Sequence, residues 1–220
     1  EASDSTLAIS GCIMAFSSNM RGALFMSLSM AGFTFNDSIV KLLTDHINVG
    51  QVMFLRGVVA TLLIYLLARQ RRAVRPLRVL ADRWVGLRVV GEVGGTLTFL
   101  VGLSHIPLAN ASAILQALPL AVTMGAALFL SEPVGWRRWG AILAGFAGVL
   151  IIVRPGLEGF SPYALMIVGT VIFAAARDLA TRKVNAAIPS LFLSTITAAA
   201  VAIAGLVLTW PMGGWRPVSL

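Results

Sequence analysis

Seven stretches of about 20 mainly apolar residues follow one another along this chain, and that length is what a helix needs to cross a bilayer. We expect membrane-spanning helices at residues 22–43, 49–68, 84–103, 107–130, 134–153, 162–184 and 188–210. The composition agrees, because 58% of the 220 residues are hydrophobic and only 12% are charged, against about 25% charged residues in soluble domains. The sequence therefore predicts an all-α, polytopic membrane protein whose surroundings are a lipid bilayer.

Successive loops between these spans lie on alternate sides of the membrane, and the basic residues are unevenly distributed between the two sides. Of the 17 Lys and Arg residues, twelve fall on the side of loop 69–83, three on the other side, and two, Arg56 and Arg177, within spans. Cytoplasmic loops carry an excess of Lys and Arg, so we expect this loop and an N-terminal tail, residues 1–20, to be cytoplasmic. The net charge of +8 does not indicate a nucleic-acid partner, because the basic residues cluster in short segments between apolar spans.

Charged and polar residues within the spans are the candidate substrate-binding residues. A charged side chain near the bilayer centre costs about 2.5–3.5 kcal/mol on insertion scales, so such a residue usually faces a polar cavity or a partner. The candidates are Asn36, Asp37, Lys41, Arg56, Glu92, Gln116, Arg177 and Asp178. We predict no catalytic residue and no metal ligand.

The charges of the first two spans also have a structural interpretation. Asp37 and Lys41 are four residues apart, so they share a helix face and could neutralise each other. Arg56 in the second span lies at nearly the same expected depth as Asp37. Two interpretations are open: Asp37 and Arg56 form a structural ion pair, or they contact the substrate directly. Both would hold if the substrate displaced one partner of the pair when it binds.

The third and fourth spans carry one candidate each. Glu92 stands among glycines with Arg88 one turn before it, so it could line a cavity, relay protons or lie at a site of close helix packing. Gln116 is followed by Pro119, which cannot donate a backbone hydrogen bond and frees a carbonyl one turn earlier. An ordinary helix kink is the alternative to a substrate contact there.

The charged end of the first span recurs in the sixth. A shift of 141 residues lays Asp37 on Asp178 and Lys41 on Arg182, and the two copies lie five spans apart, an odd number that inverts them in the membrane. Arg177 and Asp178 could hold the carboxylate and the ammonium group of a substrate, or Arg177 could reach the cytoplasm instead. We predict two inverted five-helix repeats, at residues 21–153 and, incomplete, 154–220, so that seven of ten expected spans are visible.

The run from Ile106 to Gly156 resembles an EamA-type unit of the drug/metabolite transporter superfamily. The resemblance rests on an alanine-rich start, Pro119 in mid-span, the acidic turn at Glu132, the sequence Arg137-Arg138-Trp139-Gly140 and a small-residue run to Val153. It implies ten helices in two inverted units, cytoplasmic termini, a bacterial inner-membrane location and a central cavity for a small metabolite. Members include YddG-like amino-acid exporters, sugar and cofactor permeases, and S-adenosylmethionine carriers.

Enzyme and channel functions fit the sequence poorly. Neither the HExxH motif of zinc proteases nor the GxSxG motif of serine hydrolases occurs, and no filter sequence of a channel is visible. Without an ATP-binding motif, transport is gradient-driven or facilitative and needs no cofactor; Asp37, Glu92 and Asp178 are candidate proton carriers. We predict a secondary transporter that exports amino acids by alternating access. The alternative is uptake or exchange of a nucleoside-like cofactor such as S-adenosylmethionine.

Overall fold

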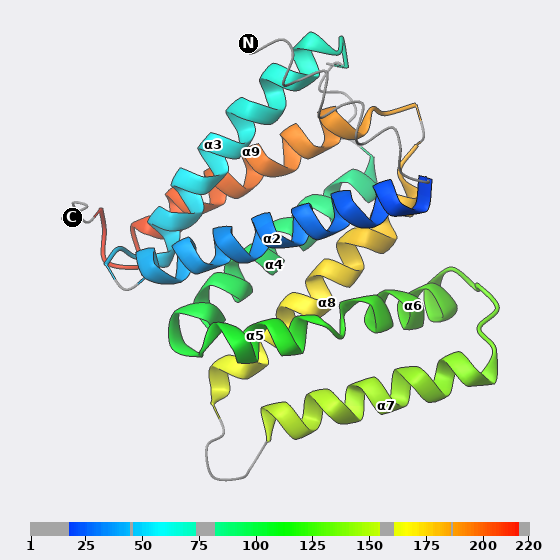
Figure 1. Ribbon diagram of the computed structural model, residues 1–220. Coiled ribbons are helices and arrows are strands. Elements are labelled where there is room, and N and C mark those ends of the chain that lie inside the picture. The colour runs from blue at the N-terminus through cyan, green and yellow to red at the C-terminus, as the bar shows by residue number, and fades with distance from the viewer. Residues whose placement is uncertain (1–17, 45, 74–81, 155–160, 186, 216–220) are drawn as a thin grey trace, which may run out of the picture. The chain divides into compact units, whose positions relative to one another are not determined.

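The computed structural model describes residues 18–44, 46–73, 82–154, 161–185 and 187–215 (Figure 1). All regular structure in these ranges is helical. The helices are α2 (Ser18–Thr44), α3 (Val49–Gln70), α4 (Arg83–His105), α5 (Leu108–Leu115), α6 (Leu118–Phe129), α7 (Trp136–Val153), α8 (Pro162–Lys183) and α9 (Ser190–Thr209). Seven segments, with α5 and α6 counted as one, are long and apolar enough to cross a membrane, which confirms the seven predicted spans.

The chain divides into two compact units, the first ending at Val40 and the second beginning at Lys41. Most of α2 lies in the first unit, whereas α3 to α9 lie in the second. Most of the predicted tail, residues 1–17, falls outside the described residues.

Local sequence signals set where the helices of the second unit begin. The side chain of Asn48 accepts a hydrogen bond from the backbone N–H of Gln51, and Asp82 accepts one from Trp84, which caps the first turns of α3 and α4. Pro162 occupies the first turn of α8, where its missing N–H leaves no hydrogen bond unmade. Pro189 directly precedes α9. These are the starts that the sequence predicted to within two residues.

The fourth span is interrupted at Gln116 and Ala117, between α5 and α6. Pro119 stands at the start of α6 and cannot donate to a carbonyl in the preceding turn, so the helix ends and restarts there. The predicted effect of Pro119 on the backbone is therefore confirmed, and it is a break between two helices.

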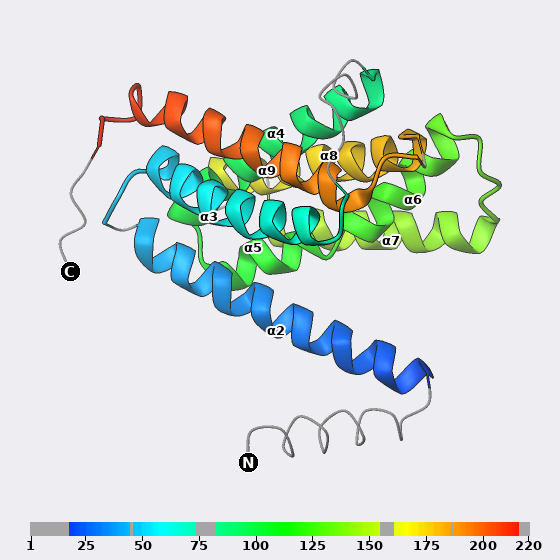
Figure 2. The same cartoon turned by 90° about the horizontal axis from the view of Figure 1, so that it is seen from above.

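Helices α3 and α9 pack along each other in opposite directions, and they lie side by side in both ribbon views (Figures 1 and 2). Glycine makes this approach possible. A Cβ atom built on Gly57 would lie 2.7 Å from the backbone nitrogen of Ala202, and one on Gly50 would lie 2.6 Å from that of Thr209. Small residues allow such contacts between helices in lipid, where packing replaces the hydrophobic effect as the driving force.

The second close pair is α4 with α8, and this pair also meets through glycine. A Cβ atom on Gly91 would lie 2.9 Å from the Cβ atom of Arg177. Thr98 and Thr170 share a hydrogen bond of 2.9 Å across the same interface. Helices α5 and α6 pack on α8, and α7 packs on α5 and α6, whereas contacts of α4 with α3 and α9 join the two pairs.

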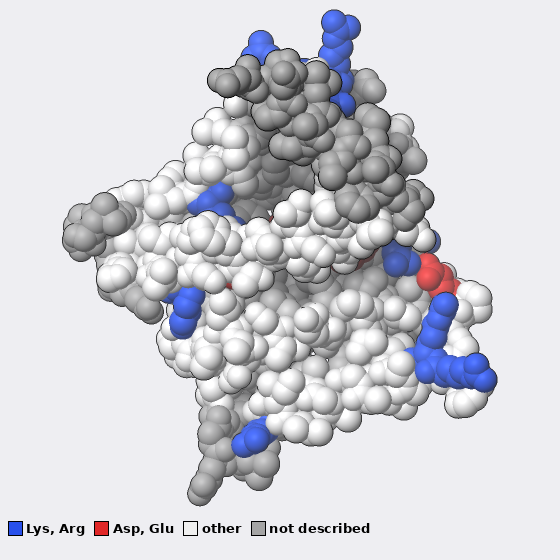
Figure 3. Space-filling model, in the orientation of Figure 1, with Lys and Arg blue, Asp and Glu red and all other residues white. Residues whose placement is uncertain are grey.

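Most of the described surface in the view of Figure 3 carries no Lys, Arg, Asp or Glu. Leu62 and Leu63 of α3 and Ile203 of α9 are more than half exposed, as expected for side chains that face lipid. Lys and Arg residues of the described ranges stand mostly at helix ends or in the loops, and in Figure 3 they appear chiefly at the margins. This distribution leaves only a few charged groups inside the bundle.

Candidate functional site

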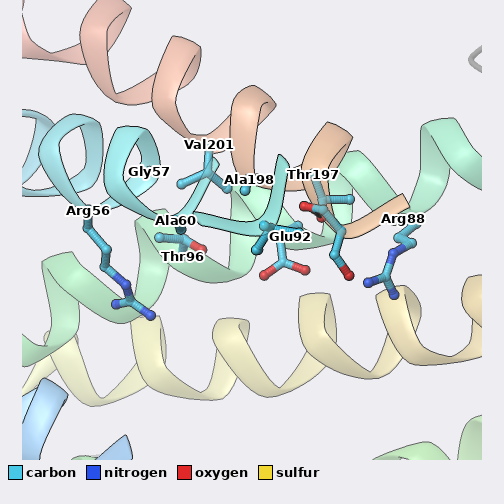
Figure 4. A pocket seen from close by; sticks show the side chains of 11 residues that line it. Arg56, Gly57, Ala60, Arg88, Glu92, Thr96, Thr197, Ala198 and Val201 are labelled. Carbon is cyan, nitrogen blue, oxygen red and sulfur yellow. Dashed lines mark hydrogen bonds between the residues drawn. The ribbon is translucent and has the colours of Figure 1, made fainter. Parts of the chain in front are cut away.

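A cavity of about 290 Å³ lies between α3, α4 and α9 in the second unit (Figure 4). It is lined by Arg56, Gly57, Ala60, Ile64, Arg88, Glu92, Thr96, Ser194, Thr197, Ala198 and Val201. At about 30 Å³ per molecule in the liquid, this volume corresponds to on the order of ten waters. The cavity therefore has the size of a small metabolite.

Helical spacing explains why these residues share one space. Arg88, Glu92 and Thr96 are four residues apart on α4, so they form one polar stripe on that helix. The α3 and α9 walls include small residues, such as Gly57 and Ala198. The cavity therefore combines the polar stripe of α4 with Arg56 of α3 and the hydroxyl residues Ser194 and Thr197 of α9.

Two arginines of the cavity carry buried nitrogen atoms with no hydrogen-bond partner among the described residues. These atoms are Nη1 of Arg56 and Nε of Arg88. Nη1 of Arg88 does have a partner, because it donates to the hydroxyl oxygen of Thr181 on α8. A buried guanidinium nitrogen without a partner carries a desolvation cost that an anionic ligand would offset.

Glu92 belongs to an ion network that reaches α8. Nη1 of Arg177 lies 3.5 Å from both carboxylate oxygens of Glu92, and Nε of Arg177 donates to Oδ1 of Asp178 at 2.9 Å. The three side chains are 26 to 37% exposed, so they are neither sealed from the surroundings nor free at the surface. One guanidinium is thus shared by two carboxylates.

The network contains two contacts that the sequence analysis did not predict. Neighbouring helix residues project in different directions, yet Arg177 is long enough to fold back onto Asp178. Glu92 forms its ion pair with Arg177, 85 residues away, whereas Arg88 donates to Thr181. The pairing of Glu92 and the hydrogen bond of Arg88 depend on the packing of α4 against α8, which no local spacing encodes.

The predicted site residues fall into separate places. Arg56 and Glu92 line the cavity, and Arg177 and Asp178 join it through Glu92. Gln116 is exposed at the break between α5 and α6 and is not part of the lining. The substrate roles of these residues stay predictions.

The candidate substrate-binding residues of α2 each take part in a hydrogen bond. Nζ of Lys41 donates to the carbonyl oxygen of Leu103 at 2.6 Å, where the C-terminal end of α4 favours a positive charge. In the first unit, Nδ2 of Asn36 donates to Oδ1 of Asp37 at 3.1 Å. The proposed Asp37–Arg56 pair stays a prediction.

Sequence reasoning missed several polar residues of the cavity. Arg88 was seen only as a neighbour of Glu92, and Thr96, Ser194 and Thr197 were not singled out. The spacing of Arg88, Glu92 and Thr96 was a usable signal, because it marks one helix face. Ser194 and Thr197 gave no such signal, since hydroxyl residues also occur in spans as helix-packing residues.

Comparison with known proteins gives a consistent set of matches. Residues 20–154 match the model of the EamA-like transporter family. The chain is 32% identical over 163 residues to the pseudopaline exporter CntI of Pseudomonas aeruginosa, covering 71% of this chain and 56% of that protein. It is 29% identical over 169 residues to a riboflavin transporter of Vibrio cholerae, covering 76% of this chain and 57% of that protein.

A third relative, an S-adenosylmethionine uptake transporter of Rickettsia bellii, is 27% identical over 188 residues. That match covers 83% of this chain and 64% of the relative. The chain thus spans a little more than half the length of these curated relatives. No solved structure gives a significant match.

Proposed function

Since the chain belongs to the EamA-like transporter family, we propose that it moves a small metabolite across a membrane by alternating access. The observation that carries this proposal is the cavity between α3, α4 and α9, which brings Arg56, Arg88 and Glu92 together inside apolar helices. Ionisable residues within membrane spans typically mark a substrate or ion pathway. The matched family and the named relatives are transporters, which agrees with a function other than catalysis.

The arrangement of α3 and α9 supports the proposed inverted repeat. The shift of 141 residues lays the start of α3, Val49, on the start of α9, Ser190. It also lays three lining residues of α3, Arg56, Gly57 and Ala60, on three lining residues of α9, Thr197, Ala198 and Val201. The same faces of two antiparallel helices would then line one cavity at a two-fold axis in the membrane plane, as in inverted-repeat transporters.

We propose amino-acid export as the specific activity, with S-adenosylmethionine-like uptake as the alternative. A cavity with both acidic and basic groups suits a zwitterion, which needs a partner for each of its charges. The relatives' names include an exporter and an uptake transporter, so both directions occur among similar proteins.

Counterflow in proteoliposomes tests the function. Liposomes preloaded with an unlabelled metabolite should accumulate the same labelled metabolite, because a carrier exchanges its substrate across the membrane without an energy source. A panel of amino acids and nucleoside-like cofactors identifies the class, and protein-free liposomes give the background. Absence of counterflow with every compound of the panel would contradict the proposal in both its forms.

We further propose that the protein lies in a bacterial inner membrane with its N-terminus in the cytoplasm. In a Cys12→Ser background, cysteine introduced at Arg71, after α3, should resist a membrane-impermeant thiol reagent in intact cells. Cysteine introduced at His105, at the end of α4, should be labelled, because α4 would run outward. Labelling after cell lysis shows that both sites are reactive, and the reverse pattern in intact cells would overturn the orientation.

A further inference from the structure

The charged residues that line the cavity and form its ion network do not balance in number, and they follow an order. We propose that the cavity binds an elongated amino dicarboxylate, with one carboxylate at Arg56, the other at Arg88 and the amine beside Glu92. This inference names the substrate class of the cavity and rests on the proposed function for its biological meaning.

The charge balance is the first argument. Two cations, Arg56 and Arg88, and one anion, Glu92, line the cavity. Arg177 and Asp178, which join Glu92 in the ion network, add one charge of each sign. These five groups carry a net charge of +1. An amino dicarboxylate carries two negative charges and one positive charge near neutral pH, so it would cancel this excess, whereas a zwitterion with one carboxylate would not.

The geometry is the second argument. The lining residues extend from Arg56 to Ile64 on α3 and from Arg88 to Thr96 on α4, which is about 12 Å along each helix. Figure 4 shows the two guanidinium groups at opposite ends of the cavity with the Glu92 carboxylate between them. This order of positive, negative and positive groups is the complement of a ligand with an anion at each end and a cation between.

The unpaired hydrogen-bond donors are the third argument. Nη1 of Arg56 and Nε of Arg88 are both buried without a partner among the described residues. Each guanidinium therefore has a donor whose hydrogen bond is unmade, and hydrogen bonds between two charged groups are stronger than those between neutral groups. The small side chains of Ala60 and Ala198 leave room between the two ends for the chain that joins the two carboxylates.

Binding of L-glutamate and L-glutamine to the detergent-purified protein tests the inference without any transport step. The two compounds have nearly the same shape, but glutamine has an amide where glutamate has its second carboxylate. We expect glutamate to bind about tenfold more tightly, because one charge-assisted hydrogen bond replaces a neutral one. Arg56→Gln and Arg88→Gln should each bring the ratio of the two dissociation constants close to one.

Arg138→Gln is the matched control, because Arg138 is an exposed arginine near the start of α7, outside the cavity, and its loss should leave the ratio unchanged. Should a glutamine variant fail to fold, Arg56→Lys and Arg88→Lys keep the charge and should preserve a preference for glutamate. Equal binding of the two compounds by the unaltered protein, or no binding of either, would overturn the inference. A preference that survives in folded Arg56→Gln and Arg88→Gln would overturn it as well. None of these binding results would bear on the counterflow of other metabolites. The proposed transport function is therefore contradicted only by the counterflow experiment.

Discussion

Gly57→Leu is expected to prevent α3 from packing against α9, and thereby to remove most of the folded protein. The first side-chain atom already collides, because a Cβ atom at this position would lie 2.7 to 2.9 Å from the backbone nitrogen, Cα and Cβ of Ala202. Backbone atoms cannot rotate away as the end of a side chain can. Overpacking typically costs about 1–3 kcal/mol and sometimes more, and we expect a value at or above the upper end here.

The measurement is the yield of monodisperse protein in size-exclusion chromatography together with the melting temperature in the same detergent. Gly86→Leu on α4 is the matched control, since a Cβ atom there meets no described atom within 4 Å. Leucine is also the better helix former, so the control should be neutral or slightly stabilising. A Gly57→Leu protein as stable as Gly86→Leu would show that α3 and α9 do not cross at Gly57.

Arg177→Gln is expected to lower transport about tenfold or more while leaving most of the protein folded. The change takes one cation from two carboxylates, Glu92 and Asp178, one of which lines the cavity. Partial exposure of the network screens part of the loss, so we expect a cost in stability of about 1–3 kcal/mol. The Glu92→Gln, Arg177→Gln double variant should recover the melting temperature but not transport.

The half-saturation concentrations on the two sides of the membrane give this prediction a second measurement. By the proposed orientation, Arg177 lies in the inner half of α8. In vesicles of known orientation, Arg177→Gln should therefore raise the half-saturation concentration more on the cytoplasmic side than on the periplasmic side. Equal effects on the two sides would refute an inner gate, and unchanged transport would remove Arg177 from the pathway.

Arg182→Gln provides the matched control for Arg177. Arg182 also lies on α8, and it pairs with Glu132 at 2.9 Å, but both side chains are about half exposed. Exposed ion pairs contribute about 0–1 kcal/mol, so this change should alter neither transport nor stability by much.

The spans and the break in the fourth of them follow from the sequence alone. Each helix needs about 20 apolar residues, and that requirement is local. Pro119 interrupts the hydrogen bonds of its own turn, so the break between α5 and α6 is also local. Asn48, Asp82 and Pro162 mark helix starts for the same reason.

The partners of the charged residues were decided only by the tertiary structure. Glu92 was a candidate from its position in a span, but its pairing with Arg177 depends on Gly91, which lets α4 approach α8. Arg56 meets the α4 stripe in one cavity because α4 contacts both α3 and α9, and Gly57 brings α3 against Ala202 of α9, 145 residues later. In lipid, apolar helix faces do not specify their partners, since lipid tails are as apolar as leucine. The close fit between small residues determines which helices pack together, and that fit exists only once the helices have formed.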